Sequence, residues 1–276
     1  MSDKGVRPGA VKTVTSLQNP FVKAVRALHQ RKGRAESGLF LAEGHKLVLD
    51  ALAVGWPPEM ILVTEEAGAR EDVAQLAARV RASGSDVIFT NGAVMEKLAR
   101  RDNPQTVIGV FEQRLTPLAS MGGGTLVALE APRDPGNVGT IVRTADALGA
   151  KGVILIGQCA DPFGIEAVRA TMGSLFHVPL ARADEDAFIA FAKAREGATV
   201  GTHLAATLDV REATPSEPQI VLMGTEQAGL TDTLAGVCDS LVKIPMAGEA
   251  DSLNLAVATA LALYELRRPF LPSASV

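Results

Sequence analysis

The sequence contains few of the residues that build metal centres, disulfide frameworks or aromatic binding platforms. Its 276 residues include two cysteines and four histidines, and aromatic residues make up 4% of the chain. Cys159 and Cys238 are too few for a disulfide framework or a zinc cluster. The histidines are scattered along the chain, so no metal site is predicted. The low aromatic content argues against a protein that holds single-stranded nucleic acid mainly by stacking bases.

Long apolar runs are also missing. No stretch approaches the roughly 20 apolar residues of a membrane-spanning helix. The N-terminus is charged and has no apolar core segment, whereas a secretory signal needs one. Hydrophobic residues nevertheless make up 47% of the chain, which is enough for buried cores. The sequence therefore predicts a cytoplasmic protein with two compact domains.

Local patterns predict where these two α/β domains begin and end. The first domain, residues 1–114, has a helix pattern at 20–29 and strand-like runs at 38–42, 60–63, 86–90 and 106–112. Residues 115–124, LTPLASMGGG, have the composition of a flexible linker. Strand and helix patterns then alternate through residues 125–276, which predicts a mostly parallel sheet.

Basic residues concentrate near the N-terminus. Residues 1–36 contain eight Lys or Arg side chains and two acidic ones, a local charge of +6. Because the whole chain has a formal charge of −4, residues 37–276 carry −10. This asymmetry indicates a basic segment that meets a polyanion, beside an acidic body. A solvated basic N-terminus without such a partner is the alternative.

Three turns in the second half of the chain place polar residues at the ends of strand-like runs. They lie in PRDPGNVGTIVRTADALG (132–149), VLMGTEQAGL (221–230) and IPMAGEADSLNLAVATALALYELRR (244–268). In an α/β domain, ligands usually bind at the carboxyl ends of the strands. The three turns therefore indicate one composite site.

The first turn leads from a strand into a helix. TLVALE (125–130) is apolar enough for a strand buried on both faces. Asn137 is predicted to be the N-cap of the following helix, whose apolar stripe ends at Gly149. Arg143 falls within the register of that stripe, and stability alone would not place a cation near a helix start. An ion pair with Asp146 is the structural alternative.

The other two turns add further polar groups. Ser252 and Asn254 open the last helix pattern, and a simple cap is one role for Ser252. Asn254 is predicted to lie in the first turn, where Asn is a poor helix former, so it is either a local hydrogen-bonding device or a site residue. Glu226 lies in the middle turn, between Gly224 and Gly229.

Three motifs within these turns match a known family. N-x-G-x-x-x-R-T (137–144), G-T-E-x-x-G-L (224–230) and I-P-M-x-G-x-x-x-S-L-N (244–254) resemble the signature motifs of the SpoU (TrmH-like) RNA 2′-O-ribose methyltransferases. The resemblance implies an α/β catalytic domain with a C-terminal trefoil knot of the SPOUT type. It also implies S-adenosyl-L-methionine as cofactor and a homodimer formed through the knotted domain. Because knots run against the general rule for chain topology, the knot is expected from the resemblance alone.

The resemblance also assigns roles to residues of this sequence. It places cofactor contacts on the main chain around Gly224, Ile244 and Leu253. Its catalytic face consists of Asn137, Arg143, Glu226, Ser252 and Asn254. The family's usual account makes Arg143 activate the ribose hydroxyl, but a guanidinium scarcely deprotonates in proteins. We expect Arg143 instead to clamp a phosphate of the target nucleotide and to stabilise the developing alkoxide. Of the histidines, only His203 is expected to approach the cofactor.

A second, less specific resemblance concerns the N-terminal half. Residues 16–52 are similar to the start of a substrate-binding domain that many of these enzymes carry, a small α/β module like the ribosomal proteins that recognise kinked RNA. On this basis four basic side chains are expected to contact RNA phosphates: Lys23, Arg31, Lys32 and Arg34. The implied partner is RNA, and family analogy favours rRNA over tRNA.

Two classes of function fit the sequence. One is an enzyme that methylates a ribose 2′-hydroxyl of structured RNA, with rRNA favoured and tRNA as the alternative substrate. The other is a non-catalytic RNA-binding factor of ribosome assembly on the same fold. The five residues of the expected catalytic face favour the enzyme, because a binding role would not need all of them. A nicotinamide-binding enzyme is disfavoured, since no strand leads into G-x-G-x-x-G.

Overall fold

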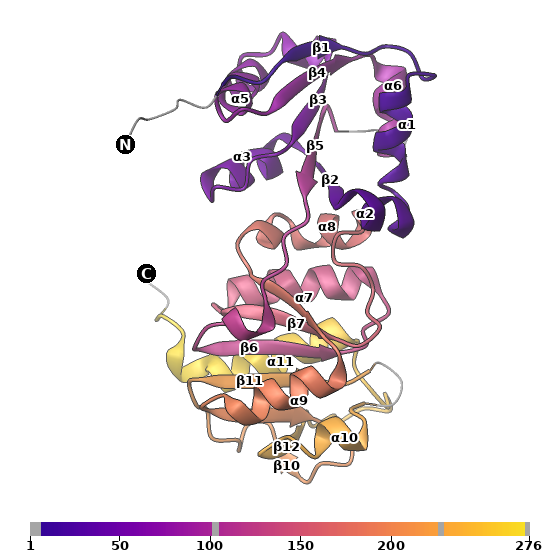
Figure 1. The fold of residues 1–276 in the computed structure, drawn as a ribbon. Helices are drawn as coiled ribbons and strands as arrows, with labels where there is room; N and C mark the ends of the chain where they lie inside the picture. Colours follow the sequence, from indigo (N-terminus) through magenta and orange to yellow (C-terminus); the bar gives the residue numbers. More distant parts are fainter. Residues whose placement is uncertain (1–6, 101–104, 226–228, 274–276) are drawn as a thin grey trace. The chain divides into compact units, whose positions relative to one another are not determined.

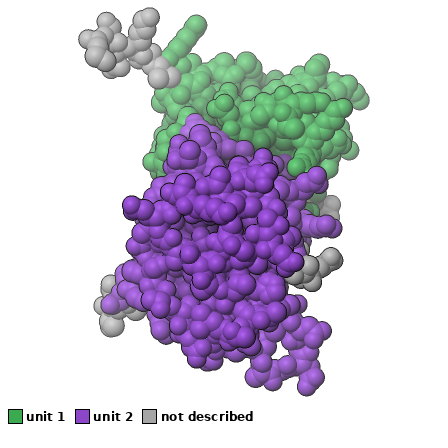
Figure 2. Space-filling view, turned by 60° about the horizontal axis from the view of Figure 1, so that its bottom comes forward, with its two compact units in different colours: residues 1–113, 163–176 green, residues 114–162, 177–276 purple. Residues whose placement is uncertain are grey.

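The protein is described by a computed structural model that covers residues 7–100, 105–225 and 229–273. It forms two compact units, coloured separately in Figure 2. Unit 1 comprises residues 1–113 and 163–176, and unit 2 comprises residues 114–162 and 177–276. The predicted division differs from these units at residues 163–176, which the sequence patterns assign to the second domain.

Unit 1 contains a five-stranded mixed sheet. Its strands are β1 (Val11–Thr13), β2 (Leu39–Glu43), β3 (Met60–Thr64), β4 (Asp86–Thr90) and β5 (Val107–Glu112), in the order β1-β4-β3-β5-β2. β1, β4 and β3 are parallel, whereas β5 runs antiparallel to both of its neighbours. Strands β2 to β5 lie at the predicted positions because each is a buried apolar run. β1 escaped prediction because it has only three residues, all of them exposed.

Short helices surround this sheet (Figure 1). They are α1 (Pro20–Ala27), α2 (Arg31–Ser37), α3 (His45–Ala53), α4 (Glu65–Gly68), α5 (Glu71–Ala82), α6 (Gly92–Ala99) and α8 (Ile165–Thr171). α1 and α6 supply one side of the core, where Val22 and Met95 pack with Leu62 and Ile108 of the strands. The side chain of Asn19 caps α1 by accepting from the main-chain N–H of Phe21. Burial of these apolar side chains is the main stabilising term for unit 1.

Unit 2 contains a seven-stranded parallel sheet. Its strands are β6 (Thr125–Glu130), β7 (Gly152–Ile156), β8 (Leu180–Ala183), β9 (Ala198–Thr202), β10 (Leu208–Asp209), β11 (Gln219–Met223) and β12 (Ser240–Lys243). The order is β10-β12-β9-β11-β6-β7-β8, and every neighbouring pair is parallel. β6, β7 and β11 are buried along their whole length. The predicted α/β fold with a mostly parallel sheet is confirmed.

The helices of unit 2 cover both faces of this sheet. They are α7 (Pro135–Ala147), α9 (Glu185–Ala194), α10 (Asp232–Ala235) and α11 (Leu255–Arg267). In the view of Figure 1, α9 lies in front of the sheet and α11 behind it, and α7 packs against α11. Phe188 of α9 and Leu234 of α10 pack on Leu126 and Leu222 of the central strands. Within the described residues, no helix of either unit is long and apolar enough to span a membrane.

The segment predicted to be a flexible linker is part of the body of unit 2. Leu118–Ser120 form a 3-10 turn, and Met121 is 5% exposed within the hydrophobic core. The guanidinium of Arg195 donates to the main-chain carbonyls of Gly122 and Gly124. The composition indicates flexibility, whereas in the structure Met121 packs into the core and Gly122 and Gly124 are hydrogen-bonded to Arg195.

Candidate active site

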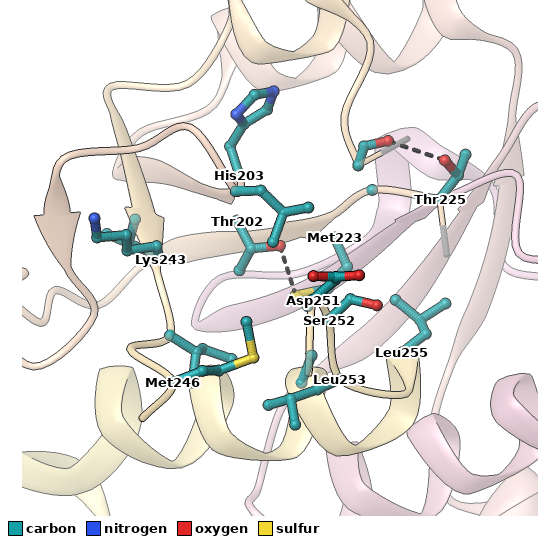
Figure 3. A pocket seen from close by; sticks show the side chains of 16 residues that line it. Thr202, His203, Met223, Thr225, Lys243, Met246, Asp251, Ser252, Leu253 and Leu255 are labelled. Atoms are coloured by element: carbon teal, nitrogen blue, oxygen red, sulfur yellow. Dashed lines mark hydrogen bonds between the residues drawn. The ribbon is translucent and has the colours of Figure 1, made fainter. Parts of the chain in front are cut away.

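The carboxyl ends of three neighbouring strands border a pocket in unit 2. Thr202 ends β9 and Met223 ends β11, whereas His203, Gly224 and Ile244 directly follow β9, β11 and β12. The lining also includes Asp251, Ser252 and Leu253, which precede α11, and Leu255, its first residue (Figure 3). The predicted cofactor residues Gly224, Ile244 and Leu253 all line this pocket. Turns far apart in the sequence therefore meet, because parallel strands bring their carboxyl ends to one edge.

Gly224 has a structural reason to be glycine that the sequence analysis did not foresee. A Cβ atom at this position would lie 2.1 Å from the carbonyl carbon of Gly229. The loop closes on itself there, with paired main-chain hydrogen bonds between Thr225 and Gly229 of 2.9 and 3.1 Å. The close approach at Gly224 is therefore made by the chain's own backbone. Glu226, expected on the catalytic face, lies outside the described residues.

The pocket is mainly apolar with a few polar groups. Leu253 and Leu255 contribute apolar surface, and the Asp251 carboxylate lies among the lining side chains (Figure 3). His203 lines the pocket as expected, and its Nδ1 accepts from the main-chain N–H of Ala205 at 3.1 Å. An apolar cavity with sparse polar groups is typical of a site for a small organic ligand.

A polar groove adjoins this pocket. Asp134, Asn137 and Asn254 line it together with Ser252 and Leu253, and the last two residues also line the pocket. The side-chain amide of Asn254 donates from Nδ2 to Oδ1 of Asn137 at 2.9 Å. Three of the five residues of the expected catalytic face, Asn137, Ser252 and Asn254, are therefore brought together.

Both helices that meet in the groove begin differently from the prediction. Asp134, not Asn137, caps α7, and its Oδ1 accepts from the main-chain N–H of Asn137 at 2.7 Å. Asn254 is itself the N-cap of α11, where its Oδ1 accepts from the N–H groups of Ala256 and Val257 at 2.9 and 3.3 Å. Ser252 lies before that helix and does not cap it. The Asp-Pro pair was the missed signal, because Pro is favoured at the first helical position after a cap.

Arg143 lies apart from the pocket. It is exposed on α7 and borders a shallow groove with Leu261 and Tyr264 of α11. Within the described residues it forms no ion pair, so the alternative pairing with Asp146 is not supported. A single copy of unit 2 therefore does not place Arg143 in the pocket wall.

Two further observations concern the Cys238 thiol of unit 2 and the basic residues of unit 1. Burial, with the Asp239 carboxylate adding to it, raises the pKa of Cys238 to about 12, so this thiol is protonated near neutral pH. Three of the expected RNA contacts, Lys23, Arg31 and Lys32, are exposed on α1 and α2. The expectation that Arg34 contacts RNA needs correction, because Arg34 is only 5% exposed and its Nη1 donates to the carbonyl of Leu28 at 2.8 Å.

Comparison with known proteins identifies the family. The model of the SpoU rRNA Methylase family matches residues 124–264, which hold the pocket, the groove and Arg143. This chain belongs to the SpoU rRNA methylase family. A second model, the MRM3-like substrate binding domain, matches residues 19–109.

Two relatives match the SpoU chain over nearly its whole length. The 23S rRNA (guanosine(2553)-2′-O)-methyltransferase of Bacillus subtilis is 31% identical, covering 93% of this chain and all of the relative. The crystal structure of an AdoMet-bound rRNA methyltransferase from Sinorhizobium meliloti is 50% identical, with a TM-score of 0.89 over 95% of this chain and 99% of that one. Both units of the SpoU chain therefore have counterparts in single relatives.

Proposed function

We propose that this protein transfers a methyl group from S-adenosyl-L-methionine to a ribose 2′-hydroxyl of structured RNA, with rRNA as the favoured substrate. The observation that carries the proposal is the continuity of pocket and groove, since Ser252 and Leu253 line both. A donor held in the pocket would adjoin the groove that Asn137 and Asn254 line. Membership of the SpoU family and the activities of the relatives support this reaction.

The pocket residues fit such a methyl donor. Gly224 presents main chain to the pocket, and Leu253 and Leu255 offer apolar contact to the faces of an adenine. The Asp251 carboxylate matches the positive charge of the donor. When bound, S-adenosyl-L-methionine supplies an electrophilic methyl group on a sulfonium. The contribution of this chain is to hold the donor and the ribose in line.

Arg143 is the group that we assign to the RNA. Its guanidinium remains charged at neutral pH and offers a planar set of donors that matches phosphate geometry. A clamp on the target phosphate would fix the nucleotide and stabilise negative charge that develops on the attacking oxygen. Asn137, Ser252 and Asn254, which line the polar groove, would orient the ribose. Glu226 is assigned to the catalytic face only because it belongs to the motif at residues 224–230.

A second copy of the chain is the partner that we propose for the outer face of α7 and α11. Val257, Leu261 and Tyr264 are 49%, 44% and 50% exposed on α11. Leu261 and Tyr264 border the same groove as Arg143. An exposed apolar face of this kind suits an interface between two copies of the chain. Dimerisation would cover these side chains and draw the exposed Arg143 into a shared site.

A trefoil knot in unit 2 is also proposed. The strand order supports it, because β12 lies between β9 and β10, which both precede it in the chain. The segment that follows β12 then returns to the pocket beside the end of β11. A knotted arrangement would hold the loops around Gly224, Ile244 and Leu253 together without metal or disulfide.

Unit 1 is proposed to bind the RNA. Its match to a substrate-binding domain and its exposed Lys23, Arg31 and Lys32 support this role. A module of this kind, similar to ribosomal proteins, supports rRNA over tRNA as the substrate. We also propose that the protein acts in the cytoplasm. A tRNA substrate, or a non-catalytic role in ribosome assembly, are the alternatives that the following experiment separates.

The experiment maps 2′-O-methylation in cellular RNA with and without this gene. We expect one ribose of rRNA to lose its methyl group, native protein to restore it, and the Asn254→Ala variant not to restore it. Arg70→Gln, which changes only an exposed ion pair with Asp72, is the matched control and should restore methylation. A change confined to tRNA would favour the tRNA alternative. Unchanged methylation in all RNA would contradict an enzymatic function.

A further inference from the structure

A segment from the second half of the sequence is built into unit 1. Residues 163–176, here called the inserted segment, comprise α8 and the 3-10 turn Ser174–Phe176. They belong to unit 1, yet unit 2 precedes and follows them in the chain. The polypeptide therefore passes between the units at three places, after residues 113, 162 and 176. A single connection would have sufficed if unit 1 were only an added domain.

Aromatic packing attaches both ends of the inserted segment to unit 1. Phe163 is 1% exposed, and its ring centroid lies 5.1 Å from that of Phe40 on β2. At the other end, the ring of Phe176 lies 4.9 Å from Phe111 on β5 and 5.4 Å from Trp56. Aromatic side chains in such contacts bury large apolar areas. The sheet of unit 1 therefore shares its aromatic cluster with residues more than 50 positions away in the chain.

An ion pair joins the middle of the segment to the same strand. Nη2 of Arg169 on α8 lies 2.9 Å from both carboxylate oxygens of Glu43, the last residue of β2. The same nitrogen donates to the carbonyl of Ala99, at the end of α6, at 3.2 Å. The Glu43 side chain is 2% exposed, and Arg169 is 36% exposed. A carboxylate buried to this extent needs its partner, because unpaired burial of a charge is strongly unfavourable.

We propose that Arg169 is a positioning residue for methyl transfer. Together with the aromatic packing of Phe163 and Phe176, its bond to Glu43 fastens the inserted segment to unit 1, and because of this segment the chain passes between the units at three places instead of one. An RNA bound to unit 1 can then adopt fewer positions with respect to the methyl-donor pocket. Restricting a tethered reactant in this way raises its effective concentration at the reacting centre. The inference rests on the proposed function.

The test uses the full-length Arg169→Gln variant. Arg70→Gln is the matched control. Arg70 lies in the same unit and forms an ion pair with Asp72, but both side chains of that pair are exposed. Four quantities are measured: the Kd for S-adenosyl-L-methionine by calorimetry, the Kd for a 23S rRNA transcript, the single-turnover rate at saturating concentrations of both, and hydrogen exchange of residues 163–176.

The proposal expects a loss of rate without a loss of binding. In Arg169→Gln the single-turnover rate should fall about tenfold, while both Kd values stay within about twofold of native. Exchange should rise in residues 163–176. Arg70→Gln should behave as native, and Arg169→Lys, which keeps the charge but loses the planar fork, should have an intermediate rate.

Two outcomes would overturn the proposal. One is a native rate in Arg169→Gln despite faster exchange in the inserted segment. The other is an equal loss of donor affinity and rate, which would mean that Arg169 only supports the fold. If Arg169→Gln does not fold, Arg169→Lys is judged by the same criteria. Failure of the proposed function is recognised separately, since the native protein would then transfer no methyl group to the transcript.

Discussion

At the scale of single residues, two asparagines join the starts of two helices. Asn254 caps α11 with its Oδ1 and donates from its Nδ2 to Asn137, whose main-chain N–H is held by Asp134. The Asn254 side chain is therefore bonded through both its oxygen and its nitrogen, and Asp134 holds the main chain that carries Asn137. A groove built in this way is preorganised, so little reorganisation is needed when charge develops in the reaction.

This arrangement predicts different effects for two substitutions of Asn254. Asn254→Ser keeps an oxygen that caps α11 but is too short to reach Asn137, so the free energy of unfolding should change little while the methyl-transfer rate falls. Asn254→Ala loses the cap as well, and should destabilise the protein by about 1 kcal/mol. Denaturant unfolding and single-turnover kinetics measure the two effects. Equal rates for the serine variant and native protein would contradict a role for the amide pair.

Arg143 gives the second residue-scale prediction. Arg143→Lys keeps the positive charge but loses the planar fork, so turnover should fall by about 100-fold, as expected when a transition-state donor is removed. The rate with labelled S-adenosyl-L-methionine and an rRNA transcript measures this effect. A lysine variant with a near-native rate would rule out the fork geometry as the important property.

At the scale of elements, the loop after β11 depends on a position without a side chain. In Gly224→Ala the new Cβ would clash with the main chain of Gly229 at 2.1 Å, so the loop must move. We expect calorimetry to detect no binding of S-adenosyl-L-methionine. Gly123→Ala is the matched control, because Gly123 lies in unit 2 outside the three motifs and a Cβ there meets no atom within 4 Å. Native affinity in Gly224→Ala would show that the loop geometry is not needed for the pocket.

The exposed basic residues of α1 and α2 carry the second element-scale prediction. Replacing Lys23, Arg31 and Lys32 by Gln should weaken RNA binding and reduce its salt dependence. The slope of log K against the logarithm of salt concentration should decrease in magnitude by about 0.7 to 0.9 for each lost phosphate contact. Filter binding at several salt concentrations gives this slope.

The control for this experiment removes the same number of positive charges from another part of unit 1. The residues replaced by Gln are all exposed: Lys46 on α3, Arg70 directly before α5 and Arg79 on α5. Their replacement should leave the salt slope of RNA binding unchanged. An equal loss of slope in both triple variants would mean that net charge, and not these helices, governs RNA binding.

The elements show which features the sequence could predict. Strands β2 to β6 were predicted within a residue or two, because buried apolar runs bounded by Gly, Pro or charged residues have a local signature. The start of α1 was predicted as well, but those of α7 and α11 were not, since the choice between Asp134 and Asn137 as cap depends on a hydrogen bond. Arg34 was misassigned for a similar reason: charge is visible in the sequence, but its burial against Leu28 is not.

At the scale of the whole molecule, the sequence did not predict how the chain is shared between units. Glu43 and Arg169 pair across 126 positions, and no local pattern indicates such a contact. The meeting of the three motif turns, in contrast, could be predicted, because parallel topology brings strand ends together wherever they lie in the sequence. Family resemblance supplied the cofactor and the catalytic roles, which periodicity does not provide.

The oligomeric state gives the prediction at this scale. If a second copy covers the outer face of α7 and α11, native protein should sediment as a dimer, and Leu261→Glu should shift it to monomer by burying a charge at the interface. Val54→Glu is the control, because Val54 is similarly exposed, at 42%, but lies in unit 1. A native protein that stays monomeric at micromolar concentration would contradict the proposed dimer.

The most direct test of the central claim is product analysis after methyl transfer. Native protein is incubated with methyl-labelled S-adenosyl-L-methionine and protein-free 23S rRNA, and the RNA is digested to nucleosides and examined by mass spectrometry. The account predicts that the label is recovered in one 2′-O-methylated nucleoside, and that Asn254→Ala greatly reduces it. Label on a base, or no label in the RNA, would contradict it.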